Sequence, residues 1–373
     1  MVVCDVCGKR RAVVLQRHTG RRLCKECFME DVYKRVKREV ERWNMFSPGD
    51  TLLLGLSGGK DSWVLLDTLT RIHDPSKIIA VTIIEGIPGY NREEYAERVR
   101  RKALEYGVDH VLTSIKEYTG YTLAEIVEKA WARGVRVSPC TYCGIARRRI
   151  LNFFARMYGA SRTVTAHNLD DESQTAIINM LRGDWEGLLR QHPLSGPASP
   201  LIVPRVKPLR KIYEWETATY SYLGGFPLQE TECAYIHLAP TLRARVRWAL
   251  QRLEDMRPGT LYTLMETLDE LLAEHAASLK PRQLPRCERC GEPTAPGRRL
   301  CKLCELLEKA GIREPAYARW KDLLDKPQLL KLHWLESRRG GALGDGEREA
   351  SAPRSDSEEA QAQEARPNRP GNP

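Results

Sequence analysis

The sequence predicts a doubly wound α/β fold, in which a parallel sheet is flanked by an N-terminal and a C-terminal zinc-binding module. Strand patterns alternate with helical patterns between residues 47 and 115, an order typical of parallel sheets. A glycine-rich turn follows the first of these strands. Two Cys-x-x-Cys pairs lie near the N-terminus and two more lie beyond residue 285, a spacing typical of four-cysteine zinc sites.

The charge and the cysteine content of the chain indicate what kind of partner it binds and in which compartment it resides. The 373 residues carry a formal net charge of +10 and have a pI of about 9.1, which favours a polyanionic partner over a membrane. No apolar run is long enough to span a bilayer, and the first residues lack the pattern of a signal peptide. The 11 cysteines, an odd number found mostly in pairs, indicate metal sites in a reducing compartment. We therefore expect a cytoplasmic protein.

The first expected domain, residues 1–46, combines a zinc site with a basic helix. Four cysteines frame a basic loop and can bind one Zn²⁺ tetrahedrally: Cys4, Cys7, Cys24 and Cys27. From Phe28 to Phe46 apolar residues recur at helical spacing, and basic residues fill the other positions. This pattern fits either a nucleic-acid contact or the solvated face of a core helix.

The glycine-rich turn is the strongest ligand-binding signal in the chain. It lies between a buried strand, Thr51–Leu56, and a helix that starts near Trp63. Glycines let the backbone approach closely, and unpaired N–H groups at a helix start bind phosphate. The turn adds a lysine ammonium and two serine hydroxyls, and all of its residues are candidates for nucleotide binding: Ser57, Gly58, Gly59, Lys60, Asp61 and Ser62. Its spacing differs from that of a Walker A loop and of a GxGxxG turn.

Later strands add further candidates for the nucleotide site. Strands are expected over 78–84, 108–112 and 162–166, with a helix over 92–106. Ile83, at the end of its strand, is the expected adenine contact. The fourth strand ends in the sequence HNLDDE, where His167 and Asp171 are candidates for holding Mg²⁺ or the nucleotide. A helix N-cap formed by Asp170 or Asp171 would also explain this motif.

Three cysteines remain outside the two four-cysteine groups: Cys140, Cys143 and Cys233. Pro139 indicates a helix start, so we expect backbone N–H groups to lower the pKa of the Cys140 and Cys143 thiols. The arginine triplet 147–149 is a candidate phosphate contact on the same helix. The trio fits an iron–sulfur cluster with one iron free of protein ligands. It also fits a persulfide or disulfide relay, a Cys3His zinc site with His237, or buried inert thiols.

The remainder of the chain is expected to be helical around a second zinc site. Five prolines within 192–208 indicate an irregular loop, and helical patterns cover 213–222 and 242–279. A second group of cysteines predicts another Zn²⁺: Cys287, Cys290, Cys301 and Cys304. The expected domains are the zinc module 1–46, an ATP-binding catalytic domain 47–240, a helical extension 241–284, the zinc module 285–338 and a disordered tail 339–373.

Several motifs carry a family resemblance. SGGKDS resembles the PP-loop of the ATP pyrophosphatases, which have the adenine nucleotide alpha hydrolase-like fold and split ATP between its α and β phosphates. Together with PCTYCGIARRR, HNLDDE, LRGD and TECAY, it resembles the tRNA 2-thiouridine synthetases, the cytosolic thiouridylases of archaeal and eukaryotic type. The cysteine pairs resemble the terminal zinc domains of that family, and the resemblance covers about residues 1–310.

The resemblance implies an ATP-dependent tRNA uridine 2-sulfurtransferase. In that family ATP adenylates the C2 oxygen of a uridine, sulfur then attacks C2, and AMP leaves. The family uses a [4Fe–4S] cluster and takes sulfur from a ubiquitin-like carrier protein with a C-terminal thiocarboxylate. The resemblance is compatible with a homodimer.

The resemblance also implies roles for individual residues. The turn 57–62 would bind the ATP phosphates, and three cysteines would hold the cluster and carry the sulfur chemistry: Cys140, Cys143 and Cys233. Asp171 matches an acid of the family motif. Arg147 is a catalytic candidate because some uridine-54 enzymes have lysine there, although arginine is a poor proton shuttle. The surrounding sequence also resembles the wobble-uridine members, so the target is position 34 or 54.

Two other functions remain compatible with the sequence. Another adenylating PP-loop tRNA enzyme, of the lysidine synthetase type, would need no cysteine trio. A nucleic-acid-binding protein with zinc modules and a regulatory ATP site would release neither AMP nor pyrophosphate in response to tRNA.

Overall fold

The computed structural model describes residues 2–90, 93–228, 231–236 and 241–342, and the chain divides into two units, 1–330 and 331–373. Helix α13 (Pro327–Ala342) makes residues 339–342 of the expected tail helical. The rest of that tail and His237, the alternative zinc ligand, lie outside the described residues. Among the described residues we find no helix with the length and apolar character needed to cross a bilayer.

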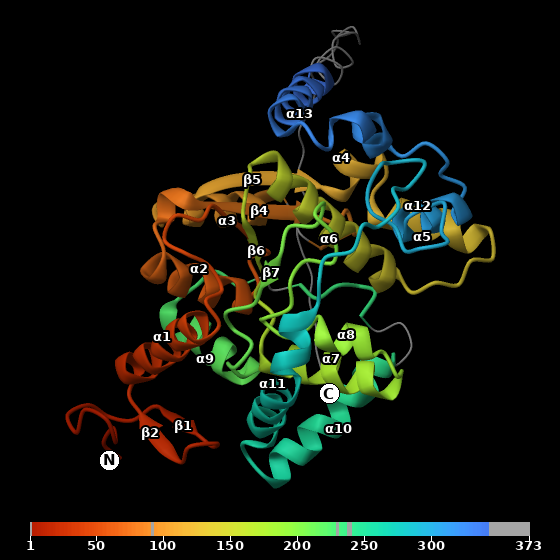
Figure 1. The fold of residues 1–373 in the computed structure, drawn as a ribbon. Helices are drawn as coiled ribbons and strands as arrows, with labels where there is room; N and C mark the ends of the chain where they lie inside the picture. Colours follow the sequence, from red (N-terminus) through yellow and green to blue (C-terminus); the bar gives the residue numbers. More distant parts are fainter. Residues whose placement is uncertain (1, 91–92, 229–230, 237–240, 343–373) are drawn as a thin grey trace, which may run out of the picture. The chain divides into compact units, whose positions relative to one another are not determined.

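Five parallel strands form the sheet of the first unit, in the order β5-β4-β3-β6-β7 (Figure 1). Their bounds are β3 Leu52–Gly55, β4 Ile78–Ile84, β5 Asp109–Ser114, β6 Arg162–Val164 and β7 Arg205–Val206. The strand that comes first in sequence, β3, is central, and later strands extend the sheet first on one side and then on the other. This order confirms the doubly wound fold. The sequence does not predict β7, because its two residues lie within the proline-rich loop.

The other elements precede, separate and follow these strands along the chain. A separate hairpin consists of β1 Val14–Gln16 and β2 Arg21–Leu23. The helices are α1 Lys25–Arg42, α2 Lys60–Ile72, α3 Glu93–Glu105, α4 Ile115–Thr119, α5 Leu123–Ala132, α6 Pro139–Met157, α7 Leu169–Leu181, α8 Trp185–Leu189, α9 Glu214–Gly224, α10 Leu242–Met256, α11 Thr260–Ser278 and α12 Lys302–Lys309, with short 3-10 helices at Pro75–Lys77 and Ala316–Leu323.

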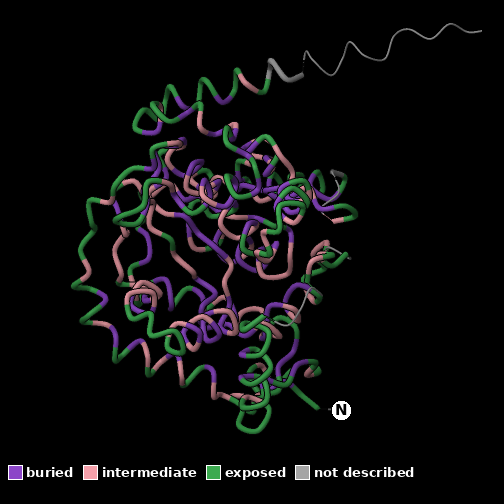
Figure 2. Tube along the Cα trace, turned by 90° about the vertical axis from the view of Figure 1, so that its right-hand side faces the viewer, coloured by how far each residue is buried: buried purple, intermediate pink, exposed green. Residues whose placement is uncertain are grey.

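Helices cover both faces of the sheet. Leu54 of β3 belongs to one buried cluster with side chains of α2 and α3. The next residue, Gly55, faces Leu151 of α6, whose Cδ1 would lie 3.4 Å from a Cβ placed at Gly55. Because alternate strand residues point to opposite faces, α2 and α3 lie on one face and α6 on the other. Figure 2 shows many buried (purple) segments toward the middle of the trace and exposed (green) segments around them.

Two arginines of the basic helix α1 form ion pairs with other helices of the core. Arg35 pairs with the buried Glu216 of α9 at 2.6 Å, and Arg42 pairs with Glu266 of α11 at 2.8 Å. These two arginines therefore hold α1 against the core. The basic residues of the helix that are exposed and do not pair with another described element are Lys25, Lys34, Lys37 and Arg38.

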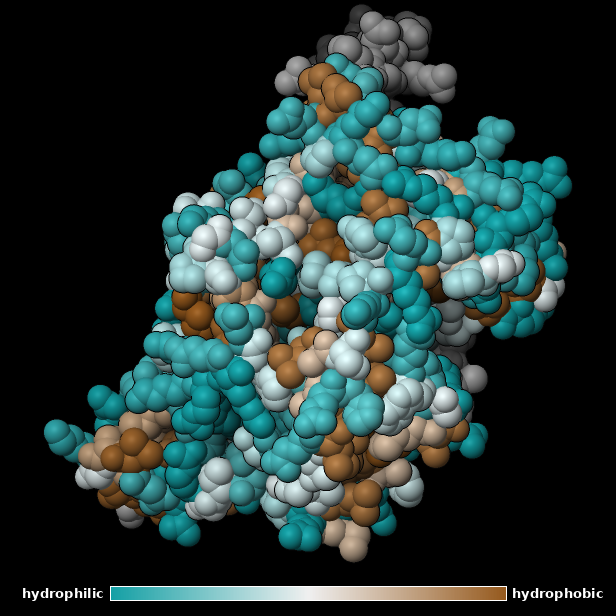
Figure 3. Space-filling view, viewed as in Figure 1, coloured by the Kyte–Doolittle hydropathy of each residue, from teal (hydrophilic) through white to brown (hydrophobic). Residues whose placement is uncertain are grey.

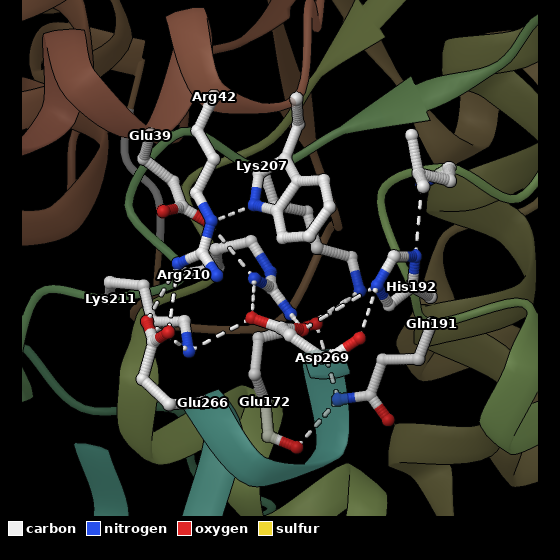
Figure 4. Close-up of polar contacts among 12 residues, drawn as sticks. Glu39, Arg42, Glu172, Gln191, His192, Lys207, Arg210, Lys211, Glu266 and Asp269 are labelled. Atoms are coloured by element: carbon white, nitrogen blue, oxygen red, sulfur yellow. Dashed lines mark hydrogen bonds and ion pairs between the residues drawn. The ribbon is translucent and has the colours of Figure 1, made fainter. Parts of the chain in front are cut away.

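The helical pattern over 242–279 forms two helices, because the chain turns at Gly259 with φ +101°, a conformation that favours glycine. A buried ion cluster attaches α11 to the sheet domain and to α1 (Figure 4). In this cluster Arg210 donates to both carboxylate oxygens of Asp269, at 2.6 and 2.7 Å, and to Glu39 at 2.9 Å. Such a bidentate buried arginine fixes geometry more than it adds stability, and its Nε has no hydrogen-bond partner among the described residues.

Candidate active site and metal centres

The turn after β3 presents free backbone N–H groups at the start of α2. Gly59 is the N-cap of this helix, and no side chain forms a cap hydrogen bond there. Ser57 Oγ accepts from the Gly59 N–H at 3.3 Å, and Ser62 Oγ donates to the Gly59 carbonyl at 2.8 Å. The two hydroxyls are thus held beside the helix start, which suits an anion such as phosphate.

Gly58 is the residue on which the shape of the turn depends. Its φ is +78°, and a Cβ at this position would lie 2.7 Å from side-chain atoms of Tyr95 and Val99 on α3. The Tyr95 hydroxyl donates to the Gly58 carbonyl. Glycine is therefore required by both conformation and space, and α3 braces the turn from behind.

Asp61 ties the turn to two other segments. Its Oδ1 accepts from the Thr217 hydroxyl of α9 at 2.5 Å and from Asn168 Nδ2 at 3.1 Å. Asn168 is also the N-cap of α7, since its Oδ1 accepts from the Asp171 N–H at 3.0 Å. The expectation that Asp170 or Asp171 caps this helix is therefore wrong.

Lys60 belongs to a series of ion pairs that extends to Arg247 on α10. Its Nζ lies 3.1 Å from Asp61 Oδ2 and 3.1 Å from Glu214 Oε1. The other oxygen of Glu214 accepts from Arg247 at 2.8 Å. Although burial lowers the pKa of Lys60, the carboxylates of Asp61 and Glu214 raise it overall. Lys60 is therefore charged, and in this structure its ammonium faces acids.

A cavity of about 270 Å³ opens beyond the carboxyl ends of β3, β4 and β6. It lies where the strand order reverses, the usual ligand site of a doubly wound sheet. Most of the predicted nucleotide-binding residues line it: Ser57, Gly59, Asp61, Ser62, Ile83 and His167. The other two, Gly58 and Lys60, belong to the turn but not to the lining.

The opposite wall of this cavity is formed by α6. It contributes Arg147, beside Gly144 and Arg148, and Arg147 Nε lies 3.7 Å from Glu85 Oε1. Cys140 and Cys143 occupy the first turns of this helix; the first is exposed and the second is partly buried. One cavity thus joins the glycine-rich turn to the helix that carries two of the three remaining cysteines.

The Cys143 thiol is not activated in the way that its position at a helix start suggested. Burial raises the pKa of Cys143 to about 11, and the nearby Arg147 offsets only part of this effect. The expectation of a lowered pKa is wrong for Cys143, because desolvation outweighs the helix N-terminus. Burial also raises the pKa of Cys233, and the charge of Cys140 contributes a further increase.

Two carboxylates face the cavity. Asp61 and Asp171 both line it, and burial, with Asp61 contributing, raises the pKa of Asp171. Arg243 lies 3.8 Å from Asp171. Asp170 has a structural contact instead, because its Oδ2 accepts from the Glu214 N–H at 2.7 Å. Paired carboxylate oxygens are the ligands that Mg²⁺ prefers, so this arrangement suits a metal-bound nucleotide.

Two groups of four cysteines converge as their spacing predicts. Within each group all Sγ atoms lie within 4.8 Å of one another: Cys4, Cys7, Cys24 and Cys27, and Cys287, Cys290, Cys301 and Cys304. Tetrahedral zinc with Zn–S bonds of about 2.3 Å would place its sulfurs about 3.8 Å apart. The closest recorded pairs, at 4.0 and 3.7 Å, match this spacing. Over the described ranges, Cys140, Cys143 and Cys233 form no such group.

The two groups share one design. A glycine with positive φ follows the first pair, Gly8 at +61° and Gly291 at +73°, and its N–H donates to the first cysteine's carbonyl at 2.9 and 2.8 Å. The second pair begins a helix, with Cys24 and Cys301 as the N-caps of α1 and α12. Each group can hold one metal ion.

Each cysteine module contacts a helix near the cavity: the C-terminal module contacts α6, and the N-terminal module contacts α9. Glu292 of the C-terminal module is buried and accepts from Arg149 of α6 at 2.7 Å. The expected phosphate contact therefore fails for Arg149, which has a buried acid as its partner. At the other end, Gln16 of the hairpin donates to Glu216 of α9 at 3.1 Å.

Some lining residues had no signal in the sequence. Arg205 lines the cavity from β7, which the proline-rich loop concealed. Arg148 and Arg205 also line a second cavity, of about 610 Å³, that continues under this loop. Thr217 and Glu214 reach the turn from α9, and no motif marks them. Only long-range packing brings these residues to the site.

Comparison with known proteins is consistent with this geometry. Residues 3–29 match the family described as 2-thiouridine synthetase TtuA, N-terminal LIM domain, and residues 30–204 match the PP-loop domain. The chain is 36% identical to tRNA 2-thiolation protein NcsA of Haloferax volcanii, covering 82% of this chain and 98% of that protein. It is 31% identical to cytoplasmic tRNA 2-thiolation protein 1 of Aspergillus niger, covering 84% and 90% respectively.

A solved structure shows the same architecture. It is the U34-tRNA thiolase NcsA from Methanococcus maripaludis with its [4Fe–4S] cluster, with a TM-score of 0.67 and 28% identity. The match covers 83% of this chain and 96% of the other. The family assignment rests on the two terminal cysteine groups, on the PP-loop sheet and on the sequence identity with the relatives. The chain belongs to the tRNA 2-thiolation protein family.

Proposed function

We propose that this chain is an ATP-dependent tRNA uridine 2-sulfurtransferase and that it acts on uridine 34. The observation that carries the proposal is the single cavity lined by the phosphate turn on one side and by the cysteine-bearing helix α6 on the other. The relatives are named tRNA 2-thiolation proteins, and the related solved structure is that of a U34-tRNA thiolase. Neither an enzyme of the lysidine synthetase type nor a regulatory ATP site explains why Cys140 and Cys143 occupy the first turns of the helix that forms this wall of the cavity, although the two thiols do not line the cavity itself.

The first step activates the uracil C2 carbonyl, which has no leaving group of its own. Its oxygen attacks the α-phosphorus of ATP, the bond to pyrophosphate breaks, and N3 loses its proton. The turn N–H groups with Ser57 and Ser62 bind the phosphates. Asp61 and Asp171 would hold Mg²⁺ on them, and Ile83 and His167 would bound the nucleoside. A pre-formed anion site of this kind lowers the barrier chiefly by orientation and electrostatics.

The second step replaces oxygen by sulfur. A hydrosulfide sulfur attacks C2, the C2–O bond breaks, AMP leaves with that oxygen, and N3 regains a proton. This exchange needs no oxidant or reductant. Arg147 keeps its charge and stabilises the negative charge that develops near C2.

The remaining cysteines fit an iron–sulfur cluster better than a single zinc ion. Cys140, Cys143 and Cys233 are free thiols, and they lack the close spacing of the two zinc-like groups among the described residues. A cluster is larger than one ion and needs its ligands farther apart. When bound, it would supply an iron free of protein ligands to hold the incoming sulfur.

We further propose a structural Zn²⁺ in each four-cysteine group, because the sulfur spacing matches tetrahedral zinc. A ubiquitin-like carrier protein with a C-terminal thiocarboxylate would supply the sulfur, and the enzyme would act as a homodimer. The relatives from Aspergillus niger and Oryza sativa are named cytoplasmic tRNA 2-thiolation protein 1, in agreement with the expected location.

The test uses the full chain, purified without oxygen, with ATP, Mg²⁺, sulfide and an unmodified tRNA transcript bearing uridines 34 and 54. Nucleoside mass spectrometry should detect 2-thiouridine, and nuclease mapping should place it at position 34. AMP and pyrophosphate should form in equal amounts. Thiolation at position 54 would overturn the choice of uridine. Pyrophosphate release without thiolation would favour another adenylating enzyme, and no tRNA-dependent release would leave a regulatory ATP site.

A further inference from the structure

Helix α10 presents an arginine- and tryptophan-bearing stripe to solvent. Val246 and Leu250 are buried against α7 and α11, which fixes the orientation of the helix. On its opposite side, residues spaced three, four and seven apart share one face: Arg245, Trp248, Arg252 and Met256. We name these four residues the outer stripe of α10. Its indole is 67% exposed and its methionine 83% exposed.

The charges of the outer stripe are not neutralised locally. Neither Arg245 nor Arg252 has an ion pair with any residue that the structure describes, and the Arg252 guanidinium lies 5.3 Å from the centre of the Trp248 ring. The acids near the end of this helix have other partners: Asp255 pairs with Arg17 at 3.3 Å, and Glu254 accepts from the first N–H groups of α11. The surface over α10 and α11, at the bottom of Figure 3, accordingly mixes hydrophobic and hydrophilic groups.

The flank of the same helix reaches the candidate active site. Arg243 lies 3.8 Å from Asp171, which lines the cavity, and Arg247 lies 2.8 Å from Glu214, which holds Lys60. A ligand on the outer stripe would therefore lie one helix away from the nucleotide cavity.

We propose that the outer stripe of α10 is an RNA-docking surface, on which arginines bind phosphates and Trp248 stacks on an unpaired base. The proposal rests on the proposed function for the identity of the RNA, a tRNA. RNA is the occupant that this chemistry favours, because aromatic rings stack on unpaired bases while guanidinium groups pair with phosphates. A membrane or an apolar protein partner would not explain why Arg245 and Arg252, which precede and follow Trp248 on the stripe, have no acidic partner among the described residues. Arg252 lies over the indole ring, and Trp248 remains largely exposed, so a base can stack on it.

The test measures binding of an unmodified tRNA transcript to the full chain at several salt concentrations. Trp248→Ala should weaken binding about tenfold, within the range expected for loss of one stacked base, whereas Trp248→Phe should retain most of the affinity. The double variant Arg245→Ala/Arg252→Ala should reduce the slope of log affinity against log salt by about 1.5, the loss expected for two phosphate contacts. The matched control is Trp185→Ala, which removes another exposed indole, on α8, and should leave affinity and slope unchanged.

Kinetic and hydrodynamic readouts separate the alternatives. With saturating tRNA, Trp248→Ala should keep the wild-type kcat for thiolation and show about a tenfold higher KM for tRNA. Binding by this variant within twofold of wild type would overturn the proposal while thiolation by the wild type still stood. Loss of a dimer in sedimentation without loss of tRNA affinity would overturn it in favour of an interface between copies. Wild-type protein that binds tRNA through Trp248 but never thiolates it would refute the proposed function alone.

Discussion

Asn168 donates from its side-chain amide to Asp61 Oδ1 at 3.1 Å and so joins two motifs that lie 107 residues apart. The same side chain accepts from the Asp171 N–H and caps α7. One amide therefore sets the position of the glycine-rich turn relative to the acidic motif. Both carboxylates that face the cavity depend on it.

Substitution of Asn168 should separate its two contributions. Asn168→Ala removes the cap and the bond to Asp61, so the free energy of unfolding should fall by about 1–2 kcal/mol. Asn168→Asp keeps a good cap but places a carboxylate beside Asp61. Its stability should stay within about 1 kcal/mol of wild type while tRNA-dependent pyrophosphate release falls at least tenfold. Urea unfolding and a pyrophosphate assay check both variants, and wild-type turnover in Asn168→Asp would refute the positioning role.

Two glycine substitutions with the same backbone requirement should differ in effect. Gly58→Ala forces a Cβ to 2.7 Å from Tyr95 and Val99, whereas a Cβ at Gly89, with φ +75°, would have no atom within 4 Å. Gly89→Ala should cost about 1 kcal/mol, the strain of the left-handed conformation alone. Gly58→Ala should cost about 3 kcal/mol or more and should abolish ATP binding. Equal losses of stability in the two variants would show that α3 does not brace the turn.

Acid stability should depend on His110. Burial lowers the pKa of His110 to about 4, and its Nε2 lies 2.8 Å from Thr82 Oγ1. The Thr82 hydroxyl already donates to the Leu56 carbonyl at 2.6 Å, so the neutral imidazole donates from Nε2 to Thr82.

The sign of this pH dependence follows from the lowered pKa. An unfolded histidine has a pKa of about 6.5, so between about pH 6.5 and pH 4 the unfolded chain binds a proton that folded His110 does not. Its contribution to stability is present above pH 6.5 and is lost as the pH falls through this window. Urea unfolding at pH 7.5 and pH 5 should show a smaller loss for His110→Asn than for wild type. An equal loss in both proteins would contradict this account.

Removal of one cysteine from either group should remove one metal ion. Purified wild-type chain should contain two zinc ions, and Cys7→Ser or Cys301→Ser should each contain one. Cys301→Ser should also reduce thiolation, because the C-terminal module holds α6 through Glu292 and Arg149. Elemental analysis gives the metal content, and three zinc ions in the wild type with no iron would favour a zinc site at Cys140, Cys143 and Cys233.

The sequence predicted the elements whose signals are local. The continuous apolar run Ile78–Ile84 is β4 at the expected bounds, and the cysteine spacing correctly gave both converging groups. Most residues predicted to bind the nucleotide line one cavity, because a strand, a glycine-rich turn and a helix start fix their positions along the chain.

The features that the sequence did not predict correctly depend on long-range contacts. β7 has two residues and forms only because β6 offers a free edge. The residue that caps α7 is Asn168 and not the neighbouring acids, because its amide also serves Asp61. Burial decides the thiol pKa of Cys143, and no local pattern reports how deeply a helix start will be buried. Helices α4 and α5 lie in a segment for which no secondary structure was predicted.

The most direct test of the central claim is to follow both half-reactions in one oxygen-free assay with the tRNA transcript. The account predicts that Cys143→Ser keeps tRNA-dependent pyrophosphate release, forms no 2-thiouridine and binds less iron than wild type. Asp61→Asn, on the opposite wall of the cavity, should lose both half-reactions and keep its iron. Thiolation by Cys143→Ser at the wild-type rate would contradict the assignment of sulfur transfer to the cysteines of α6.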